Sequence, residues 1–356
     1  MSSEKEHETL QPIHPSMRGK LDPVFEEIYN ENIANTPMRP PDLAALRTKY
    51  SILYSYATAP APDVRRVYED TLPLEDGQLL KVRVYEPNSE GPWPVHLDFH
   101  GGGWGLGDLE TESHICQHIC AKANVAVIDI GYRLLPENPF PAAIMDSFEA
   151  LKYIHAYGAE RFNITTESIS LGGVSAGAFI ALALPYLATE ASIPLRLVAV
   201  GTPVIDDLSQ YATAADSPYA SMRENEFAPT LNWARLTWFD KIKWSTLPSD
   251  PSAREAAKRE MGWFTNLLDA PKATSEHPKT VIYTAGADPL RDEGERYAQK
   301  LVEQGVEVTM RRFPGVPHPF MHMDKDLWQA REFIDLTARE IRLAHHERPA
   351  GRDTRG

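Results

Sequence analysis

A serine flanked by glycines lies near the middle of the chain, in the stretch LGGVSAGAFI that begins at Leu171. The serine is Ser175, and Gly173 and Gly177 lie two residues before and two residues after it. In a sharp strand-to-helix turn the serine backbone is strained, and side chains at those two positions would collide with neighbouring elements. Such a turn exposes the hydroxyl and directs the amide of the next residue, Ala176, toward the same space. The pattern therefore predicts a nucleophilic serine.

A serine hydroxyl is a weak nucleophile until a base removes its proton, so a histidine and an acid that orients it are also needed. His318 follows one expected strand and Asp288 follows another. Together with Ser175 they come in the order serine, acid, histidine that one strand-and-helix architecture uses. Asp292 is the rival acid, but it lies inside an expected helix, so we favour Asp288. The ordinary alternatives are a helix cap for Asp288 and a surface position for His318.

Three successive glycines, Gly101, Gly102 and Gly103, lie between His100 and Trp104. Attack of a hydroxyl on an acyl carbon places negative charge on the carbonyl oxygen, and a fixed N–H donor there contributes roughly 3 kcal/mol. Glycine amides reach such an oxygen without side-chain obstruction, so the run predicts an oxyanion hole. A phosphate-binding loop is the alternative, but the run lacks the Lys-Ser/Thr of a P-loop and the spacing of a dinucleotide-binding turn.

Apolar, strand-like runs alternate with helix-like segments around these residues. The expected strands cover 95–99, 125–130, 169–172, 281–285 and 306–313, and the expected helices lie near 112–122, near 142–155, from 176 onward and near 293–304. This alternation predicts a parallel sheet built from strand–helix–strand units. Residues 79–85 predict an antiparallel strand at the edge of the sheet. Pro185 is expected to kink or end the helix that follows the serine.

Two regions depart from the alternation and define the expected domain organisation. We expect an N-terminal helical cap segment over 1–65, a core in two parts over 66–205 and 266–345, a cap or lid insertion over 206–265, and a flexible tail over 346–356. Long insertions in compact domains are usually functional. A helical decoration that only buries an edge is the alternative. Trp104, Trp233 and Phe320 are expected to line a substrate pocket.

The composition is that of a large globular chain. Of its 356 residues 42% are hydrophobic and 24% are charged, and 50 acidic residues against 36 basic ones give a net charge of -14. An acidic surface repels phosphate backbones and anionic lipids, so no nucleic-acid binding is expected. No apolar run approaches the roughly 20 residues of a membrane span, and the N-terminus has no signal-peptide pattern. We therefore expect a cytoplasmic protein without membrane insertion.

The two cysteines, Cys116 and Cys120, are too few for a disulfide framework. With His114 and His118 they suggest a metal site, but the cysteine pair and the histidine pair project from different helix faces. A tetrahedral site needs ligands that converge on one point. We therefore expect no metal and no cofactor.

These stretches together resemble the hormone-sensitive-lipase-like group of α/β-hydrolases, which includes bacterial short-chain esterases, plant carboxylesterases and fungal esterases of specialised metabolism. The matching stretches are DFHGGGW (98–104), YRLLPENPFPAAIMD (132–146), GVSAG (173–177), DPLRDEGE (288–295) and PHPF (317–320), with PPDLAALRTKY (40–50) similar to the N-terminal cap segment of the group. The resemblance implies the α/β-hydrolase fold, with a mostly parallel central sheet, helices on both faces and a helical cap.

The resemblance also implies a role for each site residue. Ser175 is the nucleophile, His318 the base and Asp288 the residue that orients the imidazole. The oxyanion hole is assigned to Gly101, Gly102, Gly103 and Ala176, the last three as amide donors, and His100 holds the loop in shape. Glu137 and Asp146 are structural. The chain departs from the usual pattern of the group at Val174, Ala178 and Pro319, which affects the surroundings of the serine and the histidine.

The expected function is hydrolysis of carboxylic esters of a small-molecule metabolite, with a short acyl group such as acetyl, through an acyl-enzyme. One alternative uses the same three residues for transacylation, dehydration or condensation in a specialised-metabolite pathway. A second is a non-catalytic receptor for a small ligand on a hydrolase scaffold. The acyl and alcohol parts of the substrate are left open, as is the oligomeric state, with a homodimer among the options.

Overall fold

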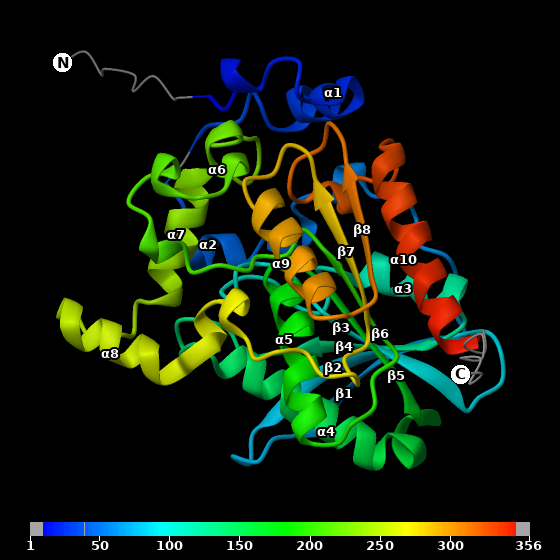
Figure 1. The fold of residues 1–356 in the computed structure, drawn as a ribbon. Helices are drawn as coiled ribbons and strands as arrows, with labels where there is room; N and C mark the ends of the chain where they lie inside the picture. Colours follow the sequence, from blue (N-terminus) through cyan, green and yellow to red (C-terminus); the bar gives the residue numbers. More distant parts are fainter. Residues whose placement is uncertain (1–9, 39, 347–356) are drawn as a thin grey trace, which may run out of the picture.

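The computed structural model describes residues 10–38 and 40–346 (Figure 1), so all but the first residue of the predicted C-terminal tail lies outside the described residues. The strands are β1 (Arg66–Pro73), β2 (Leu79–Glu86), β3 (Trp93–Phe99), β4 (Ala126–Gly131), β5 (Ile164–Val174), β6 (Leu197–Gly201), β7 (Lys279–Ala285) and β8 (Val308–Phe313). They form one sheet in the order β1-β2-β4-β3-β5-β6-β7-β8. All neighbours from β4 to β8 in this order pair in parallel, while β2 pairs antiparallel with both β1 and β4.

Helices cover both faces of this sheet. They are α1 (Pro23–Asn32), α2 (Leu43–Arg47), α3 (Ser113–Ala123), α4 (Ala142–Phe162), α5 (Ala176–Glu190), α6 (Ala220–Glu224), α7 (Trp233–Lys243), α8 (Pro251–Met261), α9 (Arg291–Glu303) and α10 (Trp328–His346). Helices α4, α5 and α9 lie over one face, and α3 and α10 lie over the other (Figure 1). The expected α/β-hydrolase architecture is thereby confirmed.

The apolar side chains of the central strands alternate between two cores, one on each face. In β7, Ile282 packs in the core beneath α4, α5 and α9, whereas its neighbours Val281 and Tyr283 pack in the core beneath α3 and α10. Successive side chains of a strand point to opposite faces, so a strand buried on both sides reads as one continuous apolar run. For this reason the central strands could be predicted from continuous apolar runs in the sequence.

One expectation about an individual element was wrong, and another was wrong in part. Residues 79–85 do form an antiparallel strand, but β1 lies outside β2, so β1 is the edge of the sheet. Pro185 neither ends α5 nor divides it into two helices, because the helix continues to Glu190. The Pro185 carbonyl is occupied by the hydroxyl of Thr189, which donates to it over 2.9 Å.

The turn between β5 and α5 brings three backbones very close together. A Cβ atom at Gly177 would lie 1.8 Å from the carbonyl oxygen of Phe99 and 2.6 Å from that of His100, and one at Gly173 would lie 2.4 Å from the same Phe99 oxygen. No side chain fits at these distances. The two glycines are therefore required because α5 starts against the end of β3.

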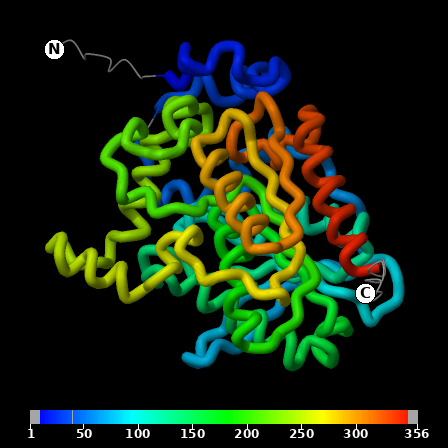
Figure 2. The backbone as a smooth tube through the Cα atoms, in the orientation of Figure 1, coloured from blue at the N-terminus to red at the C-terminus, as the bar shows by residue number. Residues whose placement is uncertain are grey.

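The helices between β6 and β7 lie above the carboxyl ends of the strands, next to the N-terminal segment. In Figure 2 the blue N-terminal segment runs beside the green part of the chain that contains α6. Two contacts join them: the Lys20 ammonium donates to the carbonyl of Glu224, and the ring of His14 stacks on Phe227 with centroids 4.2 Å apart. This arrangement is consistent with the proposed cap and lid, whose boundaries stay predictions.

Within residues 10–38 and 40–346, no helix combines the length and the apolar character that crossing a bilayer requires.

Replacing Gly177 by alanine is expected to destabilise the protein by about 1–3 kcal/mol or more, because the new methyl group must push α5 away from β3. Gly105→Ala is the matched control, since its Cβ would meet its nearest neighbours at 3.5–3.6 Å, an ordinary contact distance. Urea unfolding measures both variants. Equal stability of Gly177→Ala and the wild type would contradict the close approach.

Candidate active site

Ser175 lies at the tip of the turn between β5 and α5. Its φ of 57° and ψ of -116° place it in the sparsely populated left-handed half of backbone space. Its amide donates to the carbonyl of Gly201 on β6 over 3.0 Å, which holds the turn against the sheet. Strained residues of this kind persist only where the surrounding structure enforces them. The hydroxyl is thereby held in the cavity above the strand ends.

An acid and a histidine meet next to this serine. Asp288 Oδ2 lies 2.8 Å from His318 Nδ1, and Asp288 is fully buried while His318 is 8% exposed. The amide of Leu290 donates to the other oxygen, Oδ1, over 3.0 Å. A carboxylate at Nδ1 fixes the tautomer in which Nε2 is free to accept a proton. Asp288 is thus placed to orient the imidazole.

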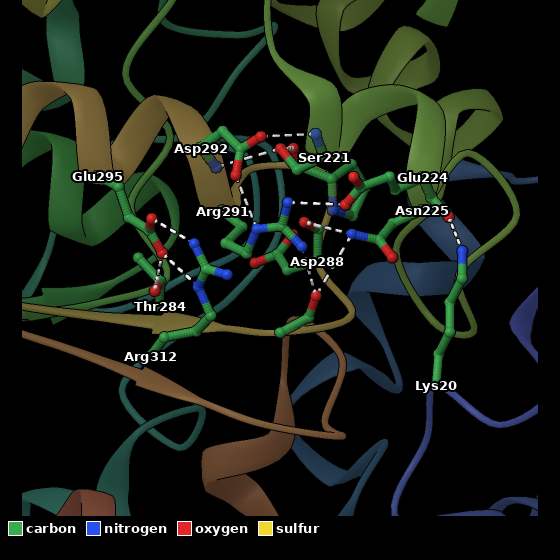
Figure 3. Close-up of polar contacts among 12 residues, drawn as sticks. Lys20, Ser221, Glu224, Asn225, Thr284, Asp288, Arg291, Asp292, Glu295 and Arg312 are labelled. Atoms are coloured by element: carbon green, nitrogen blue, oxygen red, sulfur yellow. Dashed lines mark hydrogen bonds and ion pairs between the residues drawn. The ribbon is translucent and has the colours of Figure 1, made fainter.

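The rival acid, Asp292, is engaged elsewhere. Its Oδ2 accepts from the amide of Ser221 over 2.7 Å, and its Oδ1 accepts from the guanidinium of Arg291 over 2.7 Å (Figure 3). The loop that carries Asp288 is held by the same network, since the Asn225 side chain donates to the Asp288 carbonyl and Arg291 donates to the carbonyl of Gly286. Asp292 therefore fastens α6 to the start of α9.

Ser175 and His318 line the same cavity. No hydrogen bond joins the Ser175 hydroxyl to the imidazole in the part of the chain that the structure describes. Hydrogen bonds between a nucleophile and its base are often long in ligand-free enzymes and shorten when substrate binds. The assignment of Ser175, Asp288 and His318 as a catalytic triad consequently stays a proposal.

The glycine loop after β3 folds back over the serine turn. The Gly101 amide donates to the Glu112 carboxyl group over 3.1 Å, and the Gly102 carbonyl accepts from the amide of Leu106 over 2.9 Å. The His100 ring stacks on Tyr132 at a centroid distance of 4.2 Å, and the Tyr132 hydroxyl donates to the His100 carbonyl over 2.7 Å. His100 therefore shapes the loop as the resemblance implies.

One member of the predicted oxyanion hole needs correction. The amide of Gly101 is occupied by Glu112, so Gly101 cannot donate to a substrate oxygen. Over the described residues, by contrast, the amides of Gly102, Gly103 and Ala176 donate no hydrogen bond, and Ala176 is the first residue of α5. The first amides of a helix have no partner within the helix and attract negative charge. These three amides are therefore available as donors.

Glu112 was not singled out in the sequence, yet it lies beside the serine. It is buried, it lines a second cavity whose wall also includes Ser175 and His318, and its Oε2 approaches His322 Nε2 to 3.4 Å. Burial raises the pKa of the Glu112 carboxyl to about 8, and burial lowers the pKa of His322 to about 3. Burial thus favours the neutral form of both side chains at neutral pH, while Glu112 Oε1 accepts from the Gly101 amide.

The cavity is lined mainly by the glycine loop, by helix α7 and by the N-terminal segment. Its walls include Tyr50 and Tyr54 from that segment, Trp104, and Phe239 from α7. The Trp104 prediction agrees with this position. A Cβ at Gly103 would fall 2.3 Å from the Phe239 ring, so this ring rests directly on the loop.

Two predicted pocket residues lie elsewhere. Phe320 is fully buried in the core under α3 and α10, where its ring contacts Phe313 and Phe333. Trp233, the first residue of α7, packs against the small apolar cluster between α6 and α7 and is not part of the cavity wall. The expectation for Trp233 rested on the aromatic composition of the insertion, which does not determine the direction of a side chain.

The residues of α7 that do line the cavity follow a helical spacing. Arg235, Phe239 and Lys243 recur every four residues and so lie on one face of the helix. That spacing was readable in the sequence, but aromatic composition drew attention to Trp233 instead.

The cysteines and histidines near residue 114 serve other contacts. Cys116 and Cys120 are buried in the core under α3 and α10. His114 Nε2 and His118 Nε2 approach the carboxyl group of Asp324 to 3.8 and 3.7 Å. Over residues 10–38 and 40–346, no group of three or more such side chains is arranged to hold a metal ion.

Comparison with known proteins gives a consistent result. Residues 96–322 match a family described by the alpha/beta hydrolase fold. An AB hydrolase superfamily protein of Schizosaccharomyces pombe is 32% identical over 91% of this chain and 94% of its own length. The carboxylic ester hydrolase LipN of Mycobacterium tuberculosis is 30% identical over 74% of this chain and 67% of its own. Among solved structures, the esterase of the archaeon Pyrobaculum calidifontis superposes with a TM-score of 0.76 at 26% identity and covers 90% of this chain and 98% of its own.

Asp288→Asn is expected to slow the modification of Ser175 by a fluorophosphonate about 10³- to 10⁴-fold, because an amide no longer holds the imidazole in the tautomer that accepts the serine proton. Asp292→Asn is the matched control and should react at nearly the wild-type rate, although loss of the contacts to Ser221 and Arg291 lowers its stability. Labelling rates followed by intact-protein mass spectrometry test both variants. A slow Asp292→Asn with a fast Asp288→Asn would reverse the assignment.

Glu112→Gln is expected to change how stability depends on pH. The pKa of Glu112 in the folded protein, about 8, lies above its ordinary value, so the native state keeps a proton that the unfolded state loses. Stability from this group is complete below the ordinary pKa of 4.5 and is lost progressively as pH rises from there through about 8. Glutamine stays neutral, so the stability of Glu112→Gln relative to wild type should increase with rising pH.

Urea unfolding of the two proteins at about pH 5.5 and about pH 8.5 measures this difference. The exposed Glu167→Gln serves as control for the Glu-to-Gln substitution itself. A constant difference between Glu112→Gln and wild type at both pH values would contradict the raised pKa.

Proposed function

The chain belongs to the α/β-hydrolase family, in its hormone-sensitive-lipase-like group, and is a carboxylic-ester hydrolase; on that premise we propose that it cleaves short-acyl esters of small molecules through an acyl-enzyme on Ser175. One observation carries the proposal. His318, whose Nδ1 lies 2.8 Å from the buried Asp288 carboxylate, lines the same cavity as Ser175, Gly102 and Gly103.

The first half of the reaction acylates the serine. His318 Nε2 takes the proton of the Ser175 hydroxyl as its oxygen attacks the ester carbonyl carbon. The amides of Gly102, Gly103 and Ala176 stabilise the negative charge that develops on the carbonyl oxygen. His318 then gives its proton to the departing alcohol oxygen, the carbon–oxygen bond of the ester breaks, and the acyl group remains on Ser175.

The second half repeats these steps with water. His318 takes a proton from the water molecule as it attacks the acyl carbon, the same amides stabilise the charge, and the proton returns to the Ser175 oxygen as the acid leaves. Asp288 keeps the imidazolium oriented in both halves and stays ionised.

The preference for short acyl groups is supported by the size of the groups around the loop. The Phe239 ring rests on Gly103, and Trp104 packs edge to face against Phe140 and Phe179 with centroids 5.6 and 5.5 Å apart. These aromatic rings restrict the space beside the amides that would hold the carbonyl oxygen. A long acyl chain would have to displace them.

Ser175→Ala is expected to lower kcat for p-nitrophenyl acetate by roughly 10⁵- to 10⁶-fold, because removing the nucleophile removes the covalent route. The wild type at high enzyme concentration should release an initial burst of p-nitrophenol if deacylation is the slower step. The exposed Ser245→Ala serves as control and should keep wild-type turnover. Full turnover by Ser175→Ala would refute the mechanism, and a series of esters with highest kcat/KM at acyl chains of about ten carbons or more would refute the short-acyl preference.

A further inference from the structure

A lysine ammonium is buried in the wall of the cavity that contains Ser175. Lys243 is the last residue of α7, it lines the cavity, and it is only 5% exposed. Removing an ammonium group from water costs several kcal/mol, so buried lysines are normally paired with a carboxylate. The surroundings of Lys243 therefore require an explanation.

Aromatic rings surround this ammonium instead of a carboxylate. Lys243 Nζ lies 4.3 Å from the ring centroid of Phe140, 4.5 Å from that of Trp244 and 4.8 Å from that of Trp104. In the part of the chain that the structure describes, Lys243 Nζ makes no hydrogen bond and no ion pair. Ring faces attract a cation but accept none of its three N–H groups in the way an oxygen does. The hydrogen-bonding capacity of the ammonium is therefore unused.

The acids nearest to Lys243 on either side of it are bound to other groups. Asp207 pairs with the ammonium of Lys258 at 3.0 Å, and its other oxygen accepts from the indole of Trp244 over 3.3 Å. Asp240, one helical turn before Lys243, accepts from the same indole over 3.0 Å. Neither lies within 4.0 Å of Lys243 Nζ.

The other two acids that line the cavity, Asp206 and Glu293, also form hydrogen bonds with other groups. Asp206 accepts from the hydroxyls of Tyr211 and Tyr219 over 2.8 and 3.0 Å and from the Asn266 amide over 2.7 Å. Glu293 accepts from the amide of Ile205 over 2.6 Å, and burial raises its pKa well above the ordinary value, which favours its neutral form. None of these four carboxyl groups forms an ion pair or a hydrogen bond with Lys243 Nζ, although Asp240 also lines the cavity and its Oδ2 accepts no hydrogen bond within the described residues.

We propose that the ester substrate itself carries a carboxylate, which binds the Lys243 ammonium, so that Lys243 selects anionic esters over neutral ones. Burial lowers the pKa of Lys243 to about 8, so the ammonium is mostly charged at neutral pH. An ion pair formed inside an apolar cavity is screened little by solvent, and it recovers part of the cost of burying the lysine. The inference rests on the proposed ester hydrolysis and adds its substrate class.

Arg235 is the other cation of the cavity wall. It lies eight residues before Lys243 on the same face of α7, about 12 Å away at 1.5 Å per residue, and its guanidinium lies over the ring of Trp238 at 5.2 Å. Arg235 is only half-buried and keeps contact with water. Water can therefore stabilise the charge of Arg235, whereas the more deeply buried charge of Lys243 depends more strongly on a ligand.

The test uses pairs of esters that differ only in charge. Monoethyl glutarate is compared with the ethyl ester of glutaric monoamide, which places the charge in the acyl half. Acetylated 4-hydroxybutanoate is compared with acetylated 4-hydroxybutanamide, which places it in the alcohol half. For at least one pair, the wild type should show kcat/KM at least about tenfold higher for the carboxylate, equivalent to about 1.4 kcal/mol.

The variants assign this preference to one residue. In Lys243→Met the carboxylate-to-amide ratio should fall to about one or below, a loss of about tenfold or more. The exposed Lys241→Met on the same helix should keep the wild-type ratio, and so should Arg235→Met. If the ratio is lost in Arg235→Met and kept in Lys243→Met, the assignment of Lys243 is overturned.

A binding measurement on the wild type makes the result independent of turnover and of the folding of any variant. Calorimetric titration with butanoate and with butanamide should show tighter binding of the carboxylate. Equal binding, together with a ratio of one or less for both ester pairs, refutes the role of Lys243. Failure of the wild type to hydrolyse p-nitrophenyl acetate refutes the proposed function instead, and the titration then decides the carboxylate subsite by itself.

Discussion

The close approach of α5 to the end of β3 is the constraint on which the site depends. At Gly177 the two backbones come so near that even a methyl group would lie within bonding distance of the Phe99 carbonyl oxygen. This contact sets where α5 begins, and so it sets the strained conformation of Ser175 and the position of the Ala176 amide. It also places the glycine loop, which leaves β3 immediately after Phe99, directly above the serine. The proposed nucleophile and the proposed oxyanion donors are therefore positioned by one contact between strand β3 and helix α5.

The acid and the base are positioned by a different set of contacts. Asp288 and His318 leave the ends of β7 and β8, which are neighbours in the sheet, so the parallel arrangement already brings them to the same edge. The loop of Asp288 is then fastened to α6 by Asn225, Ser221 and Asp292. A segment between β6 and β7 thus holds the loop of Asp288, the proposed catalytic acid, and through α7 also forms part of the cavity wall. This double connection links the shape of the cavity to the geometry of the proposed triad.

Most buried ionisable side chains near Ser175 are either paired with an opposite charge or favoured in their neutral form. Glu112 is kept near the glycine loop by an amide and by His322, and burial favours the neutral form of both side chains. Asp207 and Lys258 form an ion pair next to Trp244. Lys243 is the exception, because its ammonium has no oxygen partner within the described residues. A buried cation that lines the cavity without an ion pair is costly as a structural device, and we interpret it as a binding group.

The motifs and the type of each central element were predictable from the sequence because both follow from local chemistry. Strands buried on both faces must be apolar throughout, and Gly173 and Gly177 are required by a turn that spans only a few residues. The choice of Asp288 over Asp292 as the acid also rested on local sequence, because Asp288 follows an expected strand and Asp292 lies in an expected helix. The tertiary structure alone decided which groups face the cavity. Phe320 and Trp233 were expected to line the cavity, and Gly101 was counted in the oxyanion hole. Phe320 is instead buried in the core under α3 and α10, Trp233 packs against the apolar cluster between α6 and α7, and the Gly101 amide donates to Glu112. Lys243 and Glu112 are ordinary residues in the sequence, and they acquire a role only because folding removes them from water beside the serine.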